Sequence, residues 1–377
     1  MVKIKKHTLY ILYALKTKIS TAKIWLGKKL GLIRSLMIIP YQGFGNEKEI
    51  FFLGRVMRDR GIGLSAMEDS KWRNFSRMYK RFMTWEIPFT RVEAVINDIR
   101  ETAVTDEEGY FKFQIYSEKY SDFKSPHIEI KLTLPDQIIK NQSDVQAINR
   151  VVIASEDTEY GIISDIDDTI VPTGATRFWE MFKTTFFRNA HTRIPFPGVA
   201  AFYQALAKGT SGAGNNPFFY VSSSPWNLYD FLVEFMQVHK IPYGPLMLRD
   251  IGLTREYFIA GSHDEHKLLQ VKRIFAVITK IPFILIGDSG QHDAEIYLQV
   301  IKDFPGRVKM VYIRDVGTGS RTKLLKLANE IRNHGVEMML VKNTVEAAKH
   351  ALYKGWIAEN DLWSVAGEKA AEEQEVN

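Results

Sequence analysis

The sequence predicts an α/β protein in which a doubly wound parallel sheet follows a smaller, β-rich, sandwich-like domain. From Tyr160 onward, short apolar segments alternate with helical segments, which is the spacing of repeated βα units. Before about residue 150, short alternating runs are separated by turn residues, as in antiparallel sheets. The chain of 377 residues, 45% of them apolar, is long enough for two or three domains with hydrophobic cores.

Residues 1–35 are expected to form a basic helical arm. No Asp or Glu occurs between Met1 and Asn46, and this stretch carries nine of the 50 Lys and Arg residues. The remaining 41 stand against 44 Asp and Glu, so the formal net charge of +6 comes from this one segment. Lysines mixed with Trp25, Leu30 and Ile33 suit docking on an anionic membrane surface. A helix packed on the next domain with solvated lysines is the alternative.

Targeting signals and cysteine chemistry are largely excluded. The apolar run Thr8–Leu15 is short and has no small-residue cleavage site after it, so a signal peptide is the less favoured reading. No apolar run approaches the ~18 residues that a membrane span requires. Zero cysteines exclude disulfides and thiol catalysis and leave the redox compartment open. We expect a cytoplasmic protein that is peripherally associated with a membrane.

Residues 36–150 form the expected β-rich accessory domain. A turn at Thr105–Phe111 is expected to close a hairpin, with Gly109 at positive φ, and a helix is expected at Met67–Thr84. No catalytic constellation stands out here, so the domain is interpreted as a binding or support module. The expected strands cover residues 49–57, 91–98, 110–116 and 127–132.

Residues 151–360 form the expected α/β domain, and the acidic residues 361–377 are expected to be a disordered tail. The expected strands cover residues 160–164, 218–221, 246–249, 283–286, 308–313 and 336–341. The expected helices cover residues 199–208, 227–239, 266–278, 294–301, 323–333 and 344–353.

Ligands of open parallel sheets bind at the carboxyl ends of the strands, so the residues after each strand are the candidate site. The first strand ends in Asp165-Ile166-Asp167-Asp168-Thr169, where neighbouring carboxylates repel one another unless a cation neutralises them. Carboxylate oxygens without His or Cys favour Mg²⁺. The second strand runs into Ser222-Ser223-Ser224, whose hydroxyl and N–H groups suit a phosphate.

Two further elements follow in the same order along the chain. Lys267 opens the helix before the fourth strand, where an ammonium group can reach a phosphate oxygen. The fourth strand runs into Gly287-Asp288-Ser289-Gly290-Gln291-His292-Asp293, which adds two aspartates. The set D-x-D-x-T, strand-end Ser, Lys and G-D-x-x-x-x-D resembles the haloacid dehalogenase superfamily of phosphohydrolases.

The resemblance implies a role for each matched position. Asp165 would be the nucleophile that forms an aspartyl-phosphate, and Asp167 would be the general acid and base. Thr169, Ser222, Ser223 and Lys267 would bind the phosphoryl group. Mg²⁺ would be held by Asp165, Asp288 and the backbone carbonyl of Asp167, with support from Asp293.

Longer strings narrow the resemblance. Ser164–Ile170, Val221–Asn227, Leu248–Asp250, His266-Lys267 and Ile286–Asp293 together resemble the actin-patch-protein family of Mg²⁺-dependent phosphatidate phosphatases. This resemblance implies hydrolysis of phosphatidate to diacylglycerol at a membrane surface. The alternatives are a phosphatase of a soluble sugar, nucleotide or nucleic-acid end, and a non-catalytic scaffold on the same fold. No nucleic-acid partner is expected, and the sequence leaves the oligomeric state open.

The expected cap is minimal. The interval from Thr169 to Ser222 must also contain a helix and a strand, which leaves about 25 residues, Thr173–Pro197, for an insertion. A short cap leaves the site open to a bulky or surface-borne substrate. Its aromatic residues would form either an apolar lip or the core face of a helix.

Overall fold

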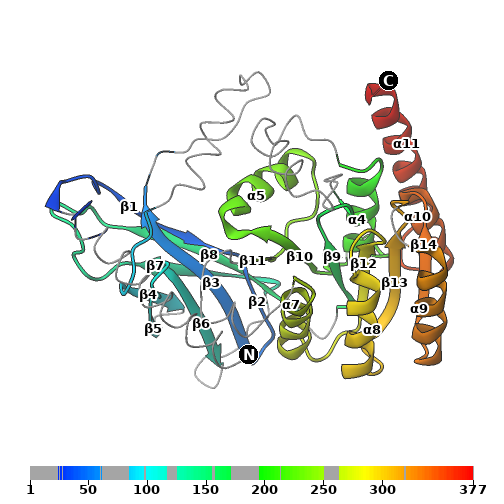
Figure 1. Ribbon diagram of the computed structural model, residues 1–377, viewed down its shortest axis with the longest axis horizontal. Helices are drawn as coiled ribbons and strands as arrows, with labels where there is room; N and C mark the ends of the chain where they lie inside the picture. Colours follow the sequence, from blue (N-terminus) through cyan, green and yellow to red (C-terminus); the bar gives the residue numbers. More distant parts are fainter. Residues whose placement is uncertain are drawn as a thin grey trace, which may run out of the picture. The chain divides into compact units, whose positions relative to one another are not determined.

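The computed structural model describes residues 24, 26–27, 29–59, 61, 85–96, 99–116, 125–154, 158–170, 195–212, 214–249, 263–317 and 320–376 (Figure 1). Those up to Ile153 form one compact unit and those from Ala154 onward form a second. The expected helix at Met67–Thr84, nearly all of the expected cap and residues 1–23 of the arm lie outside the described residues.

The first unit contains one eight-stranded, mostly antiparallel sheet. Its longest strand, β3, pairs with β1 and β2 along different parts of one edge and with β6 along the other edge. The core lies on one face and includes Ile24 and Ile33 of the arm, which are 7% and 4% exposed. The strands are β1 (Leu36–Pro40), β2 (Gly43–Gly45), β3 (Glu49–Arg58), β4 (Arg91–Ile96), β5 (Ile99–Val104), β6 (Tyr110–Tyr116), β7 (His127–Thr133) and β8 (Gln146–Ile153).

The turn before β6 differs from the expectation. Gly109 has φ 79°, as predicted, and a Cβ at this position would lie 2.5 Å from the carbonyl oxygen of Val56. The turn does not close a hairpin, however, because β5 pairs with β4 whereas β6 pairs with β3. Of the expected strand at residues 91–98, the structure describes β4 (Arg91–Ile96), which pairs with β5 (Ile99–Val104), a strand that the sequence does not predict.

The second unit contains a six-stranded parallel sheet in the order β11-β10-β9-β12-β13-β14. The chain starts in the middle at β9, builds outward through β10 and β11, and then returns to build through β12, β13 and β14. The order of the strands therefore reverses between β9 and β12. At such a switch point, open α/β sheets form their ligand-binding crevice. The strands are β9 (Gly161–Asp165), β10 (Phe218–Pro225), β11 (Leu246–Arg249), β12 (Phe283–Asp288), β13 (Val308–Arg314) and β14 (Glu337–Val341).

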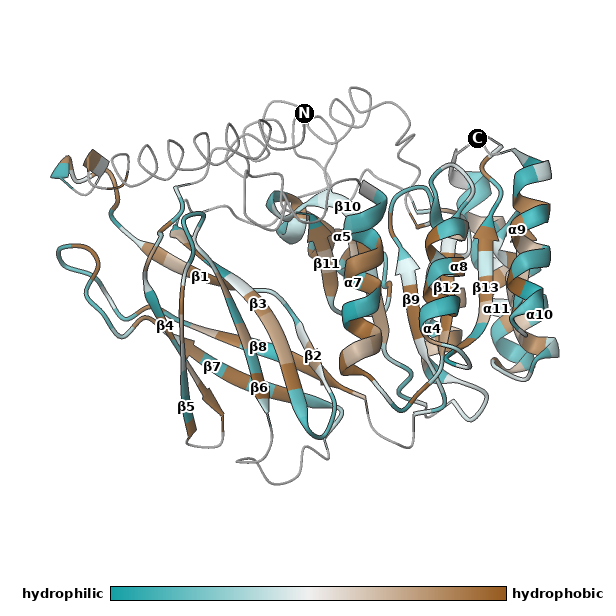
Figure 2. Cartoon of the chain, turned by 60° about the horizontal axis from the view of Figure 1, so that its bottom comes forward, coloured by the Kyte–Doolittle hydropathy of each residue, from teal (hydrophilic) through white to brown (hydrophobic). Residues whose placement is uncertain are grey.

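Helices cover both faces of this sheet, which confirms the doubly wound prediction. Successive residues of a strand point to opposite faces. Phe218 of β10 stacks on Tyr203 of α4, whereas Phe219 packs against Phe283, which contacts Phe275 of α7. The two helices therefore lie on opposite faces of the sheet. The visible turns of α9, at one end of the same sheet, are largely hydrophilic (Figure 2). The helices are α4 (Val199–Lys208), η2 (Trp226–Leu228), α5 (Tyr229–Val238), α7 (His263–Val277), α8 (Asp293–Asp303), α9 (Arg321–Asn333), α10 (Thr344–Tyr353) and α11 (Glu359–Val376).

The prediction of a disordered acidic tail is wrong. Residues 361–376 belong to α11, which packs against α4 and α10. Val365 of this helix is fully buried, and the carboxylates of Glu368 and Glu372 accept hydrogen bonds from the backbone of the chain around the start of α4. The glutamates thus have partners in the fold that amino-acid composition does not reveal.

Candidate active site

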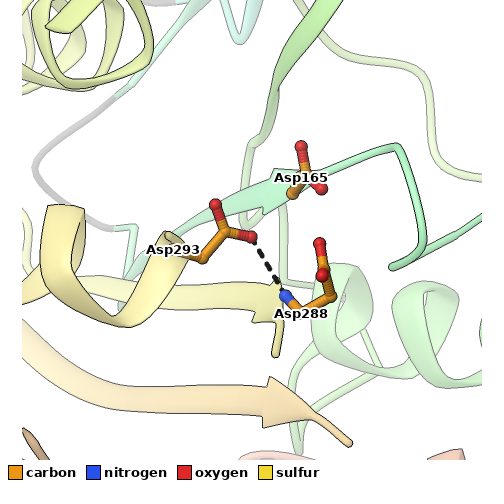
Figure 3. Close-up of side chains that lie close together, drawn as sticks. All are labelled: Asp165, Asp288 and Asp293. Carbon is orange, nitrogen blue, oxygen red and sulfur yellow. Dashed lines mark hydrogen bonds between the residues drawn. The ribbon is translucent and has the colours of Figure 1, made fainter. Parts of the chain in front are cut away.

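Three aspartates predicted from the sequence meet at the crevice between β9 and β12. Asp165 is the last residue of β9, Asp288 is the last residue of β12, and Asp293 is the first residue of α8. All three are fully buried, and each contributes one carboxylate oxygen to a group whose members lie within 4.8 Å of one another (Figure 3). The strand pairing of Ile286 with Ser164 places these strand ends side by side.

Asp293 ties the end of β12 to the start of α8. Its Oδ2 accepts the backbone N–H of Asp288 at 3.0 Å, as the dashed line in Figure 3 shows. A Cβ at position 287 would lie 2.3 Å from the same oxygen, so Gly287 is required for this close approach. The glycine and the aspartate of the motif are therefore parts of one local structure.

Lys267 supplies the positive charge of the site. Its Nζ lies 2.9 Å from Asp165 Oδ1 and also bonds to Asp293, and the residue is only 3% exposed. Burial alone would lower the pKa of Lys267, but the carboxylates of Asp165 and Asp293 outweigh burial and raise it. Lys272, one turn further along α7, pairs with Asp303 on the surface. The structure thus brings Lys267, and not Lys272, into contact with the aspartates.

The three aspartates of the cluster can carry more negative charge than the single positive charge of Lys267 balances. Burial raises the pKa of Asp165 well above its ordinary value, and the neighbouring aspartates raise it further, against the lowering effect of Lys267. Burial, followed by the charge of Asp293, raises the pKa of Asp288 to about 6. Both shifts report a site in which negative charge is costly, and a bound cation would relieve this cost.

Asp167 lies in the loop after β9 and faces the end of β10. Ser222 Oγ donates to Asp167 Oδ2 at 2.6 Å, and Ser224 Oγ donates to the same oxygen at 3.2 Å. Thr169 Oγ1 donates to Asp165 Oδ2 at 3.4 Å. Among the described residues, Ser223 makes no side-chain hydrogen bond to these groups, and it is partly exposed.

Sequence reasoning missed two residues of the site. Ser224 lies in the Ser222–Ser224 run without a predicted role of its own, and its hydroxyl contacts Asp167. Gln291 was quoted only within its motif, yet its Nε2 lies within 3.3 Å of Asp165 Oδ2, the carbonyl oxygen of Asp167 and Asp288 Oδ2. Its place inside the G-D-x-x-x-x-D motif was the available signal.

An open cavity of about 370 Å³ adjoins the loop after β9. Asp168, in a left-handed conformation with φ 55°, forms part of its wall. Arg314 of β13 lies over the ring of Phe196 at 4.3 Å and donates to Thr344. Its buried Nε has no hydrogen-bond acceptor among the described residues. The cavity therefore combines an apolar wall with a cationic group next to the aspartate cluster.

This part of the chain is similar to known proteins. Residues 160–315 match the family model for the catalytic domain of phosphatidate phosphatase APP1. Phosphatidate phosphatase APP1 of Saccharomyces cerevisiae is 30% identical over 239 residues, which are 61% of this chain and 39% of that protein. An uncharacterized protein of Schizosaccharomyces pombe is 27% identical over 270 residues, which are 68% of this chain and 42% of that protein.

The chain thus spans about two fifths of the length of these curated relatives. A carbohydrate acetylesterase from Xanthomonas citri aligns with 76% of this chain and 71% of its own, at 9% identity and a TM-score of 0.23, which supports no inference. The matched segment begins at the residue before β9, ends just after β13 and contains the whole aspartate cluster with Lys267 and Gln291. Residues 160–315 of this chain are thus similar to the catalytic domain of phosphatidate phosphatase APP1.

Proposed function

We propose that this chain is a Mg²⁺-dependent phosphatase that hydrolyses phosphatidate to diacylglycerol and phosphate. The observation that carries the proposal is the buried cluster of Asp165, Asp288, Asp293 and Lys267 at the switch point of the sheet, inside the segment that matches the family. The same cluster is what the resemblance to the haloacid dehalogenase superfamily implies for a phosphohydrolase.

The residues of the site fit a magnesium ion. The possible metal ligands that face one another are carboxylate and carbonyl oxygens, which suit a hard divalent cation. The carboxylates also carry more negative charge than the one positive charge of Lys267 balances. Asp165, Asp288 and the carbonyl group of Asp167 would hold the ion, and Asp293 would support them. When bound, the ion supplies charge neutralisation for the phosphoryl group.

Asp165 is the proposed nucleophile. Lys267 lies 2.9 Å from its Oδ1 and stabilises the ionised carboxylate that attack requires, against the effect of burial. The carboxylate oxygen forms a bond to phosphorus as the bond from phosphorus to the diacylglycerol oxygen breaks. Lys267 also offers a positive charge to the phosphoryl oxygens as their charge develops.

Asp167 is the proposed general acid and base. It gives its proton to the departing diacylglycerol oxygen, and it then takes a proton from the water that attacks the aspartyl-phosphate and releases phosphate and the Asp165 carboxylate. The hydroxyl groups of Ser222 and Ser224 can donate or accept, so they can hold Asp167 in either protonation state.

The remainder of the substrate has a candidate location. The cavity beside Asp168 has Phe196, Pro197 and Val316 as its apolar residues, and its other lining residues are charged or polar, among them the cations Arg314, Lys342 and Lys369. These cations and apolar residues together suit the ester and glycerol part of an anionic phospholipid.

The arm is the proposed membrane contact. Its described part leaves Leu26, Leu30 and Leu32 at 49%, 60% and 45% exposed, next to the basic residues Lys29 and Arg34. Exposed leucines among cations are typical of segments that lie on anionic bilayers. Within the described residues, no helix has the length and apolar character to cross a membrane.

The direct test is Mg²⁺-dependent phosphate release from phosphatidate in detergent micelles, measured beside soluble phosphomonoesters. We expect phosphatidate to be preferred. Preference for the soluble esters would support phosphatase activity but contradict phosphatidate as the substrate. No release from any substrate would favour the non-catalytic scaffold.

A further inference from the structure

The side-chain amide of Gln291 lies where three acceptor oxygens of the site converge. Its Nε2 is 3.3 Å from Asp165 Oδ2, 3.1 Å from the carbonyl oxygen of Asp167 and 3.1 Å from Asp288 Oδ2. These oxygens come from the end of β9, the loop after it and the end of β12. Because ionised carboxylates and carbonyl groups only accept hydrogen bonds, the amide must present its NH₂ group to them.

The amide of Gln291 cannot make a full hydrogen bond to each of the three oxygens. An NH₂ group has two hydrogens for three acceptors, and all three distances are at the long end of the range for N–H···O hydrogen bonds. Two of the acceptors belong to a buried cluster of carboxylates with excess negative charge. A neutral amide leaves that charge uncompensated, whereas a divalent cation neutralises it and binds several oxygens at once.

The loop between β12 and α8 holds the backbone of Gln291 independently of its side chain. Asp288 Oδ1 accepts the backbone N–H of Gly290 at 2.6 Å and that of Gln291 at 2.9 Å. Gln291 itself is only partly buried. Rotation about its side-chain bonds would therefore carry the amide toward solvent without breaking this turn.

We infer that the amide of Gln291 takes the place of the cation in the metal-free protein and withdraws when the cation binds. This inference rests on the proposed metal-dependent function. Gln291 then acts as an internal competitor. It stabilises the metal-free arrangement of the three oxygens and lowers the apparent affinity for Mg²⁺.

The test compares Mg²⁺ binding to the wild-type chain and to Gln291→Ala by titration calorimetry after chelator treatment. We expect the dissociation constant of the variant to be lower by about tenfold, because the cation no longer displaces hydrogen bonds to charged acceptors and water replaces only part of them. The metal-free variant should also have a lower Tm than the wild type and a larger rise in Tm on adding Mg²⁺.

Gln299→Ala is the matched control. Gln299 lies on α8, and its amide donates to Asp303 on the surface at 2.9 Å, so its Mg²⁺ affinity should equal that of the wild type. Gln291→Met, with a side chain of similar length and no N–H group, should reproduce the alanine result and replaces that variant if it does not fold.

The outcomes separate this inference from the proposed function. If the wild type binds Mg²⁺ and both variants bind it equally or more weakly, the competitor role is overturned while the metal site stands. Weaker binding would make Gln291 a supporter of the cation instead. If the wild type binds no Mg²⁺, the proposed metal dependence and the role of Gln291 both fail.

Discussion

The backbone N–H of Gly198 donates to the carboxylate of Glu372, 174 positions later, at 2.8 Å. The N–H of Ala201 likewise donates to Glu368 at 3.2 Å. Helix α4 has no acidic residue in its first turn and no side-chain cap of its own. Because the first N–H groups of a helix lack partners within it, the two glutamates of α11 act as a distant N-terminal cap.

This relationship predicts that Glu372→Ala together with Glu368→Ala lowers the free energy of unfolding by about 1–2 kcal/mol. Because alanine is a strong helix former, α11 should stay helical, and the loss of unfolding free energy measures the contribution of the cap. Denaturant unfolding measures it. Glu373→Ala is the control, since the Glu373 side chain is on the same helix, is 54% exposed and lies 3.6 Å from Lys369. An effect of the double variant no larger than that of the control would contradict the capping role.

The proposed nucleophile predicts that Asp165→Asn reduces phosphate release to background. The amide nitrogen or oxygen cannot form the aspartyl-phosphate, whereas the side chain keeps its size, so circular dichroism should show an intact fold. Asp303→Asn is the matched control, because Asp303 pairs with Lys272 at the end of α8 opposite Asp293. Substantial release by Asp165→Asn would rule out the aspartyl-phosphate mechanism.

The buried ion pairs of Lys267 predict a large loss of stability in Lys267→Met. The variant leaves the carboxylates of Asp165 and Asp293 without their cation, and breaking such a pair typically costs about 3–5 kcal/mol. Lys272→Met removes a partly exposed pair with Asp303 on the same helix and should cost less than about 1 kcal/mol. Equal losses in chelator-treated protein, measured by denaturant unfolding, would show that Lys267 does not compensate the cluster.

The strands and the motif aspartates were predictable because their signals are local. An apolar run such as Phe283–Ile286 followed at once by Gly287-Asp288 predicts both a buried strand and its polar end. The six parallel strands and their six main helices lie where the sequence predicted them. Gln291 and Ser224 also lie within predicted motifs, but their roles were harder to predict, since each side chain becomes part of the site only through atoms supplied by other strands.

The first unit was harder to predict for a different physical reason. Strand β2 has only three residues, and β1 ends in Pro40, so neither presents a long alternating pattern. The hairpin expected at Gly109 failed because local turn chemistry determines the bend but not which strands pair afterward. In the second unit, α11 was also not predictable from local sequence, because its glutamates are stabilised by backbone groups near the start of α4.

The arm predicts salt-dependent binding to vesicles that contain phosphatidate. Ile24 and Ile33 are part of the core of the first unit, so the deletion should stop at residue 22 and remove only the first five lysines. Deletion should weaken sedimentation with the vesicles, and binding of the full chain should fall steeply as salt rises. Equal sedimentation of the two chains would contradict the docking role of this segment.

A second variant tests the contribution of the exposed leucines to vesicle binding separately from that of the basic residues. Leu30→Ser should weaken vesicle binding by removing apolar contact without changing the salt dependence. Leu325→Ser on α9 is the control, since this leucine is 54% exposed, similar to Leu30 at 60%. If both serine variants bind like the wild type, the leucines of the arm do not enter the bilayer.

His350 lies in a partly buried position between two polar partners. Its Nδ1 is 2.8 Å from the hydroxyl of Tyr312, and its Nε2 is 3.4 Å from Glu337. Burial lowers the pKa of His350 and outweighs the opposing effect of Glu337. Glu337 keeps its charge at mildly acidic pH, because the hydrogen bond from Lys354 lowers its pKa.

A histidine whose pKa is lower in the folded chain than in the unfolded one stabilises the fold only while it is neutral. Its contribution is fully present above the unfolded value of about 6.5 and is lost as the pH falls from there through the folded pKa. The unfolding free energy of the wild type should therefore fall more between pH 7.5 and pH 5 than that of His350→Gln, which cannot titrate. Imidazole NMR should place the midpoint of His350 below 6.5, and a midpoint at or above this value would contradict the prediction.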